Sequence, residues 1–348
     1  MQEGEPGKTA RNFGICLMLG IAYAANIGGV ATLVGTFPNV VFAGMFSKHF
    51  PDGPEITFVE WLKVGLPFAA LFIPLMWAYM VLAAAPIKGQ VVKDADKLIG
   101  RELAGLGKMK RGEKMVMAIF VATAVLWISR GDIALGDLVI PGWASLLGLK
   151  AYVHDATVAM AMGILCYIIP VDRKAGEPLL DWENGGKRAP WGILLLFGGG
   201  FAIAAGFEES GLTAWVGSKL GVLEGVPVPI IIAAVAFTMT FLTEVTSNTA
   251  TTTMMLPILA ATAHVLKINP LLLMLPATMS ASCAFMLPIG TPPNAIVFAS
   301  GKVGLMQMGR TGFVLNLIGV ALITAFVYFW VVPVFDINPG EPPGWMVF

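Results

Sequence analysis

The apolar stretches of this sequence come in runs of about 20 residues or more, and this feature decides which folds are open to the chain. A helix of about 20 residues crosses the roughly 30 Å of hydrocarbon in a bilayer. The composition agrees, because 57% of the 348 residues are hydrophobic and only 13% are charged. The strands of an outer-membrane barrel would instead alternate over short segments. The sequence therefore predicts an all-α integral membrane protein.

Candidate spans follow one another along the chain, so we expect a multi-pass protein. They cover residues 13–45, 61–86, 114–130, 153–171, 190–222, 229–265, 270–309 and 312–335. Several of these runs are too long or too interrupted to be single straight helices. We expect the protein in the plasma membrane, which is the inner membrane of a cell that has two.

The segment 87–113 carries more basic than acidic residues and marks the cytoplasmic side, because cytoplasmic loops carry such an excess. Its cations are Lys88, Lys93, Lys97, Arg101, Lys108, Lys110 and Arg111. If each following span crosses the membrane once, residues 131–152 lie outside and residues 172–189 lie in the cytoplasm. The orientation is self-consistent only if 229–265 enters and leaves the membrane on the same side. We therefore expect a re-entrant hairpin there.

A polar cluster lies at the midpoint of that hairpin, in the stretch EVTSNTATTTMMLPI (244–258). A turn inside the bilayer frees backbone N–H and C=O groups, which are tolerated at that depth only inside protein or beside a polar cavity. Ser247, Asn248 and Thr249 stand where the turn is expected. The residues alone leave two interpretations open: these side chains cap the second half of the hairpin, or they line a binding site.

A short motif occurs twice, 255 residues apart, each time inside an apolar span. The copies are Gly35-Thr36-Phe37-Pro38-Asn39 and Gly290-Thr291-Pro292-Pro293-Asn294. Proline removes a backbone donor and clashes with the preceding helical turn, so both spans should be unwound there. In this orientation, the span 13–45 runs from the cytoplasm to the outside and the span 270–309 runs from the outside to the cytoplasm. The two copies of the motif are therefore inverted relative to each other in the membrane. Inverted repeats with discontinuous helices that meet at the midplane are typical of secondary transporters.

With these motifs, the chain resembles the divalent anion:sodium symporters, called the solute carrier 13 family in animals, which carry dicarboxylates, citrate or sulfate. The stretch LLLFGGGFAIAAGFEESGL (194–212) adds to the resemblance. The resemblance implies sodium-coupled transport of a small divalent anion by an elevator-type movement. We expect a C4 dicarboxylate such as succinate as the substrate, and a homodimer as the assembly.

The resemblance also implies which residues form the site. Substrate contacts are expected from Ser247, Asn248, Thr249, Thr291, Pro292 and Thr36. Sodium ligands are expected from Thr243, Asn248, Gly290 and Pro292 in the second repeat, and from Gly35 in the first. The first repeat departs from the family pattern at two positions: Phe37 replaces a proline of the second motif, and Asn26 stands where the family commonly has serine.

The charges around the motifs favour coupling to sodium. The polar cluster and the two proline motifs contain no Lys or Arg, so a bound dianion would lack a fixed cation. The N-terminus of a half-helix offers roughly half a positive charge, which attracts a carboxylate but does not neutralise two. Sodium ions on nearby carbonyl and hydroxyl oxygens would supply the rest. We therefore prefer symport to exchange, and we expect co-transported sodium and no organic cofactor.

Three carboxylates fall at membrane level, a class of residue that is often functional. They are Glu244, Glu208 and Glu209. We expect them near span ends or in local pairs, with a direct role in transport as the second interpretation.

Residues 12–86 and 224–348 are expected to form a transport unit, 87–113 an amphipathic cytoplasmic arm, and 114–223 the scaffold helices. The second repeat would hold the re-entrant hairpin 229–265 and the broken helix 270–309. The family places a second Ser-Asn-Thr hairpin ahead of the first motif, and this sequence does not contain it. We therefore expect a fragment that lacks the N-terminal quarter of a carrier.

Other classes of function fit less well. An ATP-driven pump needs a G-x-x-x-x-G-K-[ST] loop, which the sequence lacks. Three dispersed histidines without an H-E-x-x-H pattern disfavour a metalloenzyme, so we expect no enzyme. A net charge of zero gives no reason to expect nucleic acid as a partner, whereas the lipid bilayer is one. Two alternatives stay open: a carrier of sulfate or another oxyanion with the same architecture, and a truncated homologue that does not transport.

Overall fold

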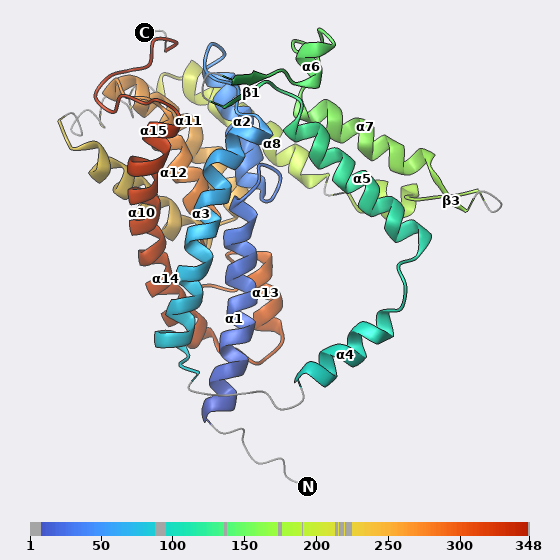
Figure 1. Cartoon of the computed structure of the whole chain (residues 1–348). Coiled ribbons are helices and arrows are strands. Elements are labelled where there is room, and N and C mark those ends of the chain that lie inside the picture. Colours follow the sequence, from blue (N-terminus) through green and yellow to red (C-terminus); the bar gives the residue numbers. More distant parts are fainter. Residues whose placement is uncertain are drawn as a thin grey trace. The chain divides into compact units, whose positions relative to one another are not determined.

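Figure 1 shows the computed structural model of the chain, which describes residues 8–87, 95–135, 138–172, 176–189, 191–212, 215, 219 and 225–346. The prediction of an all-α fold is confirmed, since helices make up most of the described elements. The helices are α1 (Lys8–Val30), α2 (Phe37–His49), α3 (Phe58–Tyr79), η1 (Met80–Ala84), α4 (Ala95–Leu106), α5 (Arg111–Ile128), α6 (Trp143–Leu146), α7 (Asp155–Ile168), η2 (Trp182–Gly186), α8 (Gly192–Glu209), α10 (Val228–Val245), α11 (Asn248–Leu266), α12 (Leu271–Ala281), α13 (Pro292–Ala299), α14 (Leu305–Phe326), η4 (Val327–Val331) and α15 (Val332–Val334).

Among the described residues, four short strands form two antiparallel hairpins in connections between helices, where the sequence gives no strand signal. β1 (Ile133–Leu135) pairs with β2 (Leu138–Ile140), and β3 (Pro170–Asp172) pairs with β4 (Glu177–Pro178). Each strand has at most three residues. Such short pairs lie below the length at which alternation of side chains gives a recognisable sequence pattern.

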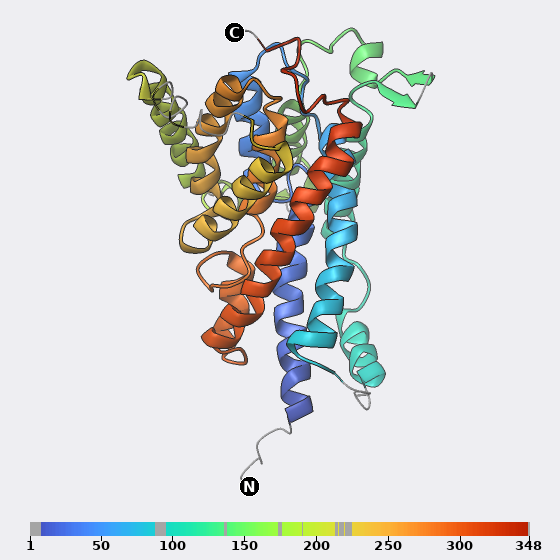
Figure 2. The same ribbon diagram turned by 90° about the vertical axis from the view of Figure 1, so that its left-hand side faces the viewer.

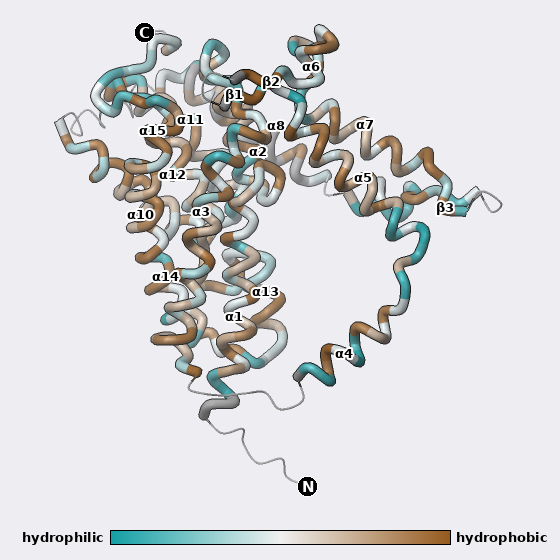
Figure 3. Tube along the Cα trace, in the orientation of Figure 1, coloured by the Kyte–Doolittle hydropathy of each residue, from teal (hydrophilic) through white to brown (hydrophobic). Residues whose placement is uncertain are grey.

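Five of the described segments are long and apolar enough to cross a membrane. They are Arg11–Val30, Phe58–Ala84, Val228–Val245, Asn248–Leu266 and Leu305–Val334. Figure 3 shows apolar residues, in brown, recurring along α3 and α14, which lie within two of these segments. Many large apolar side chains on the helices are exposed in the chain alone, as expected where lipid is the solvent.

The two predicted breaks are present. The first long run divides into α1 and α2, with residues 31–36 between them, and the run 270–309 divides into α12 and α13, with 282–291 between them. α1 packs against α13, and α2 packs against α12. The first half of each broken helix thus lies along the second half of the other, so the two run antiparallel (Figures 1 and 2). An inverted repeat predicts this arrangement, and the repeat itself stays a prediction.

α12 lies at the centre of this group of helices. All of its 11 residues are buried. Its neighbours are α2, α10, α11 and α14, and Figure 2 shows α14, in red, passing across the group. α10 and α11 form the expected hairpin, and the turn between them falls at Thr246 and Ser247, inside the polar cluster. The depth of this turn in the membrane stays a prediction.

By their contacts, the residues fall into two compact units. One contains 1–56, 60–89 and 192–348, and the other contains 57–59 and 90–191. α8, which we assigned to the scaffold, packs against α11 in the first unit. The functional division into a transport unit, an arm and a scaffold stays a prediction. Parts of it, including Lys88, Lys93 and the segment 220–224, lie outside the described residues.

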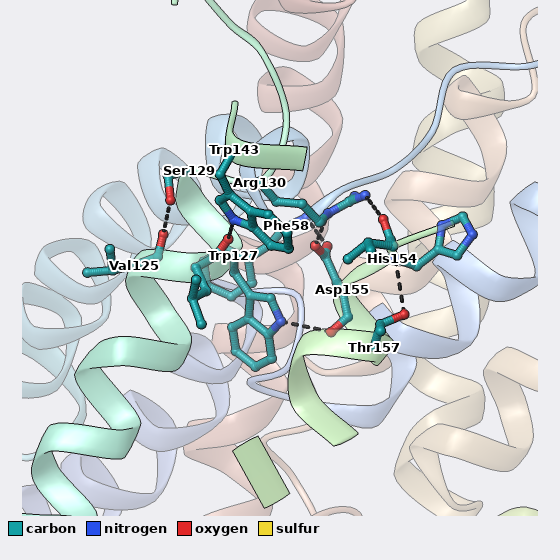
Figure 4. Close-up of polar contacts among 11 residues, drawn as sticks. Phe58, Val125, Trp127, Ser129, Arg130, Trp143, His154, Asp155 and Thr157 are labelled. Carbon is teal, nitrogen blue, oxygen red and sulfur yellow. Dashed lines mark hydrogen bonds and ion pairs between the residues drawn. The ribbon is translucent and has the colours of Figure 1, made fainter. Parts of the chain in front are cut away.

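The smaller unit contains a buried ion pair, shown in Figure 4. Arg130 Nε lies 2.7 Å from Asp155 Oδ1, and the Arg130 side chain is only 4% exposed. The other carboxylate oxygen of Asp155 accepts a hydrogen bond of 2.8 Å from the backbone N–H of Phe58, the first residue of α3. The Phe58 ring stacks on Trp127 at 5.0 Å. A buried guanidinium needs such a partner, so this cluster ties the beginning of α3 to α5 and α7.

Candidate functional site

The first break is closed by the asparagine of its own motif. The Asn39 side-chain amide donates hydrogen bonds to the carbonyls of Gly29, at 3.3 Å, and Thr32, at 2.8 Å. These carbonyls lie ten and seven residues before Asn39. The N–H of Gly35 adds a turn bond of 3.1 Å to the Thr32 carbonyl. The motif asparagine therefore satisfies carbonyls that the broken helix leaves without intrahelical partners.

The second break repeats this arrangement. The Asn294 amide donates to the carbonyls of Ala284 and Leu287, each at 3.1 Å, which again lie ten and seven residues earlier. The N–H of Gly290 bonds the Leu287 carbonyl at 3.2 Å, as Gly35 does in the first break.

The motif threonines also match, because each precedes a half-helix with the same extended backbone. The φ and ψ angles are −147° and 149° at Thr36, and −144° and 150° at Thr291. Glycine is needed just before Thr36, because a Cβ at Gly35 would overlap the carbonyl oxygen of Gly29. The motif therefore encodes one backbone shape that occurs twice.

A buried carboxylate holds the second break from the hairpin side. Glu244 lies in the last turn of α10 and is 3% exposed. Its Oε1 accepts hydrogen bonds from the N–H groups of Phe285, at 2.7 Å, and Met286, at 2.8 Å. Its Oε2 accepts one from the N–H of Leu287 at 3.0 Å. The amide of Asn316, on α14, donates to Oε1 at 2.8 Å. We expected Glu244 near a span end or in a local pair; it is near a helix end, but its partners lie far away in the sequence.

α1 holds the opposite side of the same segment. The Tyr23 hydroxyl donates to the Phe285 carbonyl at 2.9 Å. The Asn26 amide donates to Thr291 Oγ1 at 3.0 Å and to Asn294 Oδ1 at 3.3 Å. The family pattern relates Asn26 to the first repeat, whereas the structure places its side chain against the second break.

At the hairpin tip, three neutral oxygens come together. The Thr243 hydroxyl lies 2.6 Å from Asn248 Oδ1 and 3.1 Å from the Ala281 carbonyl oxygen, at the end of α12. One hydroxyl hydrogen cannot satisfy both acceptors fully. Carbonyl and hydroxyl oxygens at unwound helix ends are the ligands that transporters use for sodium. Two of the predicted sodium ligands, Thr243 and Asn248, are thus brought together, with the Ala281 carbonyl beside them.

The capping interpretation of the polar cluster holds for only part of it. Thr252 and Thr253 bond back to the carbonyls of Asn248, at 2.8 Å, and Thr249, at 2.7 Å, as helix-internal threonines do. Ser247 occupies the N-cap position of α11, yet its side chain makes no capping hydrogen bond and is exposed. The hydroxyl of Ser247 therefore remains available to a ligand.

The remaining predicted residues lie around these two breaks. Thr36 Oγ1 is 3.5 Å from Ser282 Oγ, so the first motif meets the second break. Thr291 and Thr249 are buried. Gly290 is buried beside Glu244, because a Cβ there would lie 3.2 Å from Oε2. Pro292 and Gly35 are exposed in the chain alone. The substrate and sodium roles of these residues stay predictions.

Sequence reasoning missed the side chains that support the breaks. Glu244 was noticed for its charge but not for its partners. Tyr23 and Asn316 were not selected, although a buried asparagine in an apolar helix is itself a signal, because an amide needs partners there. Of the two other membrane-level carboxylates, Glu209 is exposed, and the Glu208 side chain lies outside the described residues.

Comparisons with known proteins bear on the family of the chain. The family description "Sodium:sulfate symporter transmembrane region" matches residues 2–337. A sodium-dependent dicarboxylate transporter, SdcS, of Staphylococcus saprophyticus is 41% identical over 327 residues, which are 94% of this chain and 60% of the relative. The transporter of that name from Staphylococcus aureus strain NCTC 8325 is 41% identical over 344 residues, or 98% of this chain and 64% of the relative. The chain therefore spans less than two thirds of the length of these relatives, which are transporters and not enzymes.

Proposed function

The chain belongs to the sodium:sulfate symporter family, and on that premise we propose that it takes part in the sodium-coupled transport of a small dicarboxylate. The observation that carries the proposal is the oxygen cluster of Thr243, Asn248 and the Ala281 carbonyl at the meeting point of the hairpin tip and the second break. A cation bound there would sit among neutral oxygens, at the end of a buried helix.

The expected substrate is a C4 dicarboxylate such as succinate. α11 begins at Asn248, which belongs to this cluster, and α13 begins at Pro292, directly after the second break. Two half-helix N-termini attract carboxylates but leave part of a dianion's charge uncompensated. Bound sodium would compensate the remainder, which couples the binding of the two. The names of both Staphylococcus relatives support a dicarboxylate.

A carrier of sulfate or another oxyanion is the second candidate, because the family description names sulfate. A homologue that does not transport by itself is the third, because the relatives are longer than this chain.

The proposed movement is of the elevator type, within a homodimer in the plasma membrane. Both breaks and the α10–α11 hairpin belong to one compact unit, which supports their moving as one body. In this proposal, residues 12–86 and 224–348 form the moving part, residues 87–113 the cytoplasmic arm, and 114–223 the scaffold.

Uptake by the purified protein in liposomes tests the proposal. An inward sodium gradient should drive accumulation of labelled succinate, and a potassium gradient should not. Excess sulfate as a competitor separates the two anion classes. A protein that is folded but shows no sodium-dependent uptake or binding of either anion would overturn the proposal.

One substitution tests the oxygen cluster itself. Thr243→Val keeps the shape of the side chain and removes an oxygen, so the sodium concentration for half-maximal uptake should rise about tenfold, as expected from loss of about 1.4 kcal/mol of binding free energy. Thr324→Val on α14 is the matched control, because that hydroxyl only bonds back to the Val320 carbonyl. Unchanged sodium dependence in Thr243→Val would remove this residue from the site.

A further inference from the structure

We propose that Glu244 is a positioning residue for the sodium and substrate site. Its carboxylate holds the second break in the shape that brings the Ala281 carbonyl and Gly290 to the hairpin tip. The proposal rests on the proposed function, because it concerns the same site, but its first test does not depend on transport.

The contacts of Glu244 leave little freedom to the segment. Three consecutive backbone N–H groups, from Phe285 to Leu287, point at one carboxylate, with distances of 2.7, 2.8 and 3.0 Å. Successive N–H groups turned towards one anion form a concave anion-binding arrangement. An unwound segment inside a membrane protein needs partners for these groups, since each unsatisfied N–H is costly.

A carboxylate suits this place better than an amide does. Its four partners, the three N–H groups and the Asn316 amide, are all donors, and an ionised carboxylate accepts from all of them. A glutamine could present one oxygen, but its NH₂ group would then face another donor. The residue type therefore follows from the donor set.

The peptide groups of Phe285 are held on both sides. Its N–H bonds Glu244, and its carbonyl accepts from the Tyr23 hydroxyl at 2.9 Å. The Phe285 ring is buried against Tyr23, with ring centroids 5.1 Å apart. Side chains from α10 and α1 thus clamp the segment between them, and α14 adds Asn316.

The position of Glu244 in the sequence links this clamp to the site. Its neighbour Thr243 bonds Asn248 and the Ala281 carbonyl, which begins the segment that Glu244 holds. At the other end of the segment, Gly290 lies against Glu244 Oε2. Loss of the clamp would therefore let the Ala281 carbonyl and the predicted sodium ligand Gly290 move relative to the hairpin tip, without removing any ligand.

The first test is backbone hydrogen exchange in peptides that cover 283–290, measured by mass spectrometry on the purified protein. Glu244→Gln should raise exchange at 285–287 by about tenfold or more, because hydrogen bonds to a charged group are lost. Glu341→Gln, in the exposed C-terminal segment, is the control and should leave this exchange unchanged. Wild-type exchange in a folded Glu244→Gln protein would overturn the proposal.

The second test separates positioning from a merely structural role. The sodium concentration for half-maximal succinate binding should rise at least about tenfold in Glu244→Gln. Succinate affinity at saturating sodium should stay within about threefold, because bound sodium draws the oxygens together again. Faster exchange with unchanged sodium dependence would show a structural role only and overturn the proposal.

Two further outcomes are decisive. If Glu244→Gln does not fold, Glu244→Asp keeps the charge but shortens the reach by one methylene, and it must show the same rise in exchange and in the sodium requirement for the proposal to stand. If the wild-type protein shows no sodium-dependent binding, the proposed function fails, whereas the exchange experiment still decides whether Glu244 holds the segment.

Discussion

Asn39 and Asn294 close the two helix breaks with the same pair of hydrogen bonds, to carbonyls ten and seven residues earlier in the chain. The equivalence goes beyond the short sequence match, because it includes the turn bonds of Gly35 and Gly290. The surroundings differ: Asn294 Oδ1 accepts from Asn26, whereas Asn39 Oδ1 is buried without a hydrogen-bond partner among the described residues. One backbone shape thus serves two sites that need not be chemically equal.

Replacing the motif asparagine should destabilise the fold. Asn294→Leu keeps the size of the side chain but leaves the Ala284 and Leu287 carbonyls without their amide donor. Each carbonyl keeps one other donor, the Asn26 amide for Ala284 and the Gly290 N–H for Leu287. A net hydrogen bond contributes about 0.5–1.5 kcal/mol, so we expect the loss of two bonds to cost about 1–3 kcal/mol. Thermal unfolding in detergent measures it, with Asn338→Leu in the exposed C-terminal segment as control. An unfolding temperature equal to that of the wild type would contradict the role of this amide.

Asn248→Asp should separate the binding interpretation of the hairpin tip from the capping one. The substitution keeps the size but replaces the amide donors with a negative charge at the proposed substrate site. If Asn248 binds succinate, loss of a hydrogen bond to a charged group should weaken succinate binding by roughly ten- to a hundredfold, and repulsion should add to this.

Asn248 is the first residue of α11, where the helix N-terminus favours a negative charge, so folding should be unaffected in this variant. Calorimetric titration of the purified protein with succinate and sodium measures the effect. Wild-type affinity for both would reduce the hairpin tip to a helix cap and withdraw its proposed role in binding.

The predicted orientation can be tested at α4. Lys97 is exposed on this helix, in which apolar and charged residues alternate in Figure 3. Lys97→Cys should react with an impermeant thiol reagent only from the cytoplasmic side, because its segment carries an excess of basic residues. Tyr152 is 78% exposed, and Tyr152→Cys is the control, which should react from outside. Labelling of Lys97→Cys in intact cells would overturn the orientation, and the re-entrant hairpin with it.

Asp155→Asn should destabilise the smaller unit. The variant leaves the Arg130 guanidinium buried without its charged partner, which costs about 3 kcal/mol. Lys150→Gln is the control, because its pair with Asp132 is exposed and should contribute under about 1 kcal/mol. Thermal unfolding compares the two variants. Equal unfolding temperatures would mean that the Arg130–Asp155 pair does not stabilise the unit.

The breaks could be predicted from sequence because their cause is local. Pro38 and Pro292 interrupt a helix by the chemistry of their own rings, wherever the rest of the chain lies. The side chains that hydrogen-bond the backbone groups freed at the breaks could not be predicted in this way. Tyr23 reaches the Phe285 carbonyl across 262 residues, and no periodicity in the sequence connects the two.

In the candidate site, too, some residues could be predicted from the sequence and others only from the tertiary structure. Thr243 and Asn248 are five residues apart, and the family resemblance pointed to both; the structure brings their side chains into contact. The Ala281 carbonyl was not predicted, because any residue has a carbonyl and only the tertiary packing selects this one. Glu244 stood out as a charge among apolar residues, but only the fold shows that it faces three N–H groups.

The complete burial of α12 bears on how the protein is made. Its 11 residues would extend about 16 Å, roughly half the thickness of the hydrocarbon, so the helix cannot be inserted as an ordinary span. Its neighbours α10 and α11 leave the ribosome before it, and α14 leaves after it. α12 therefore reaches its final surroundings only once α14 has been synthesised, and assembly of this half of the protein must finish after translation has passed the second break.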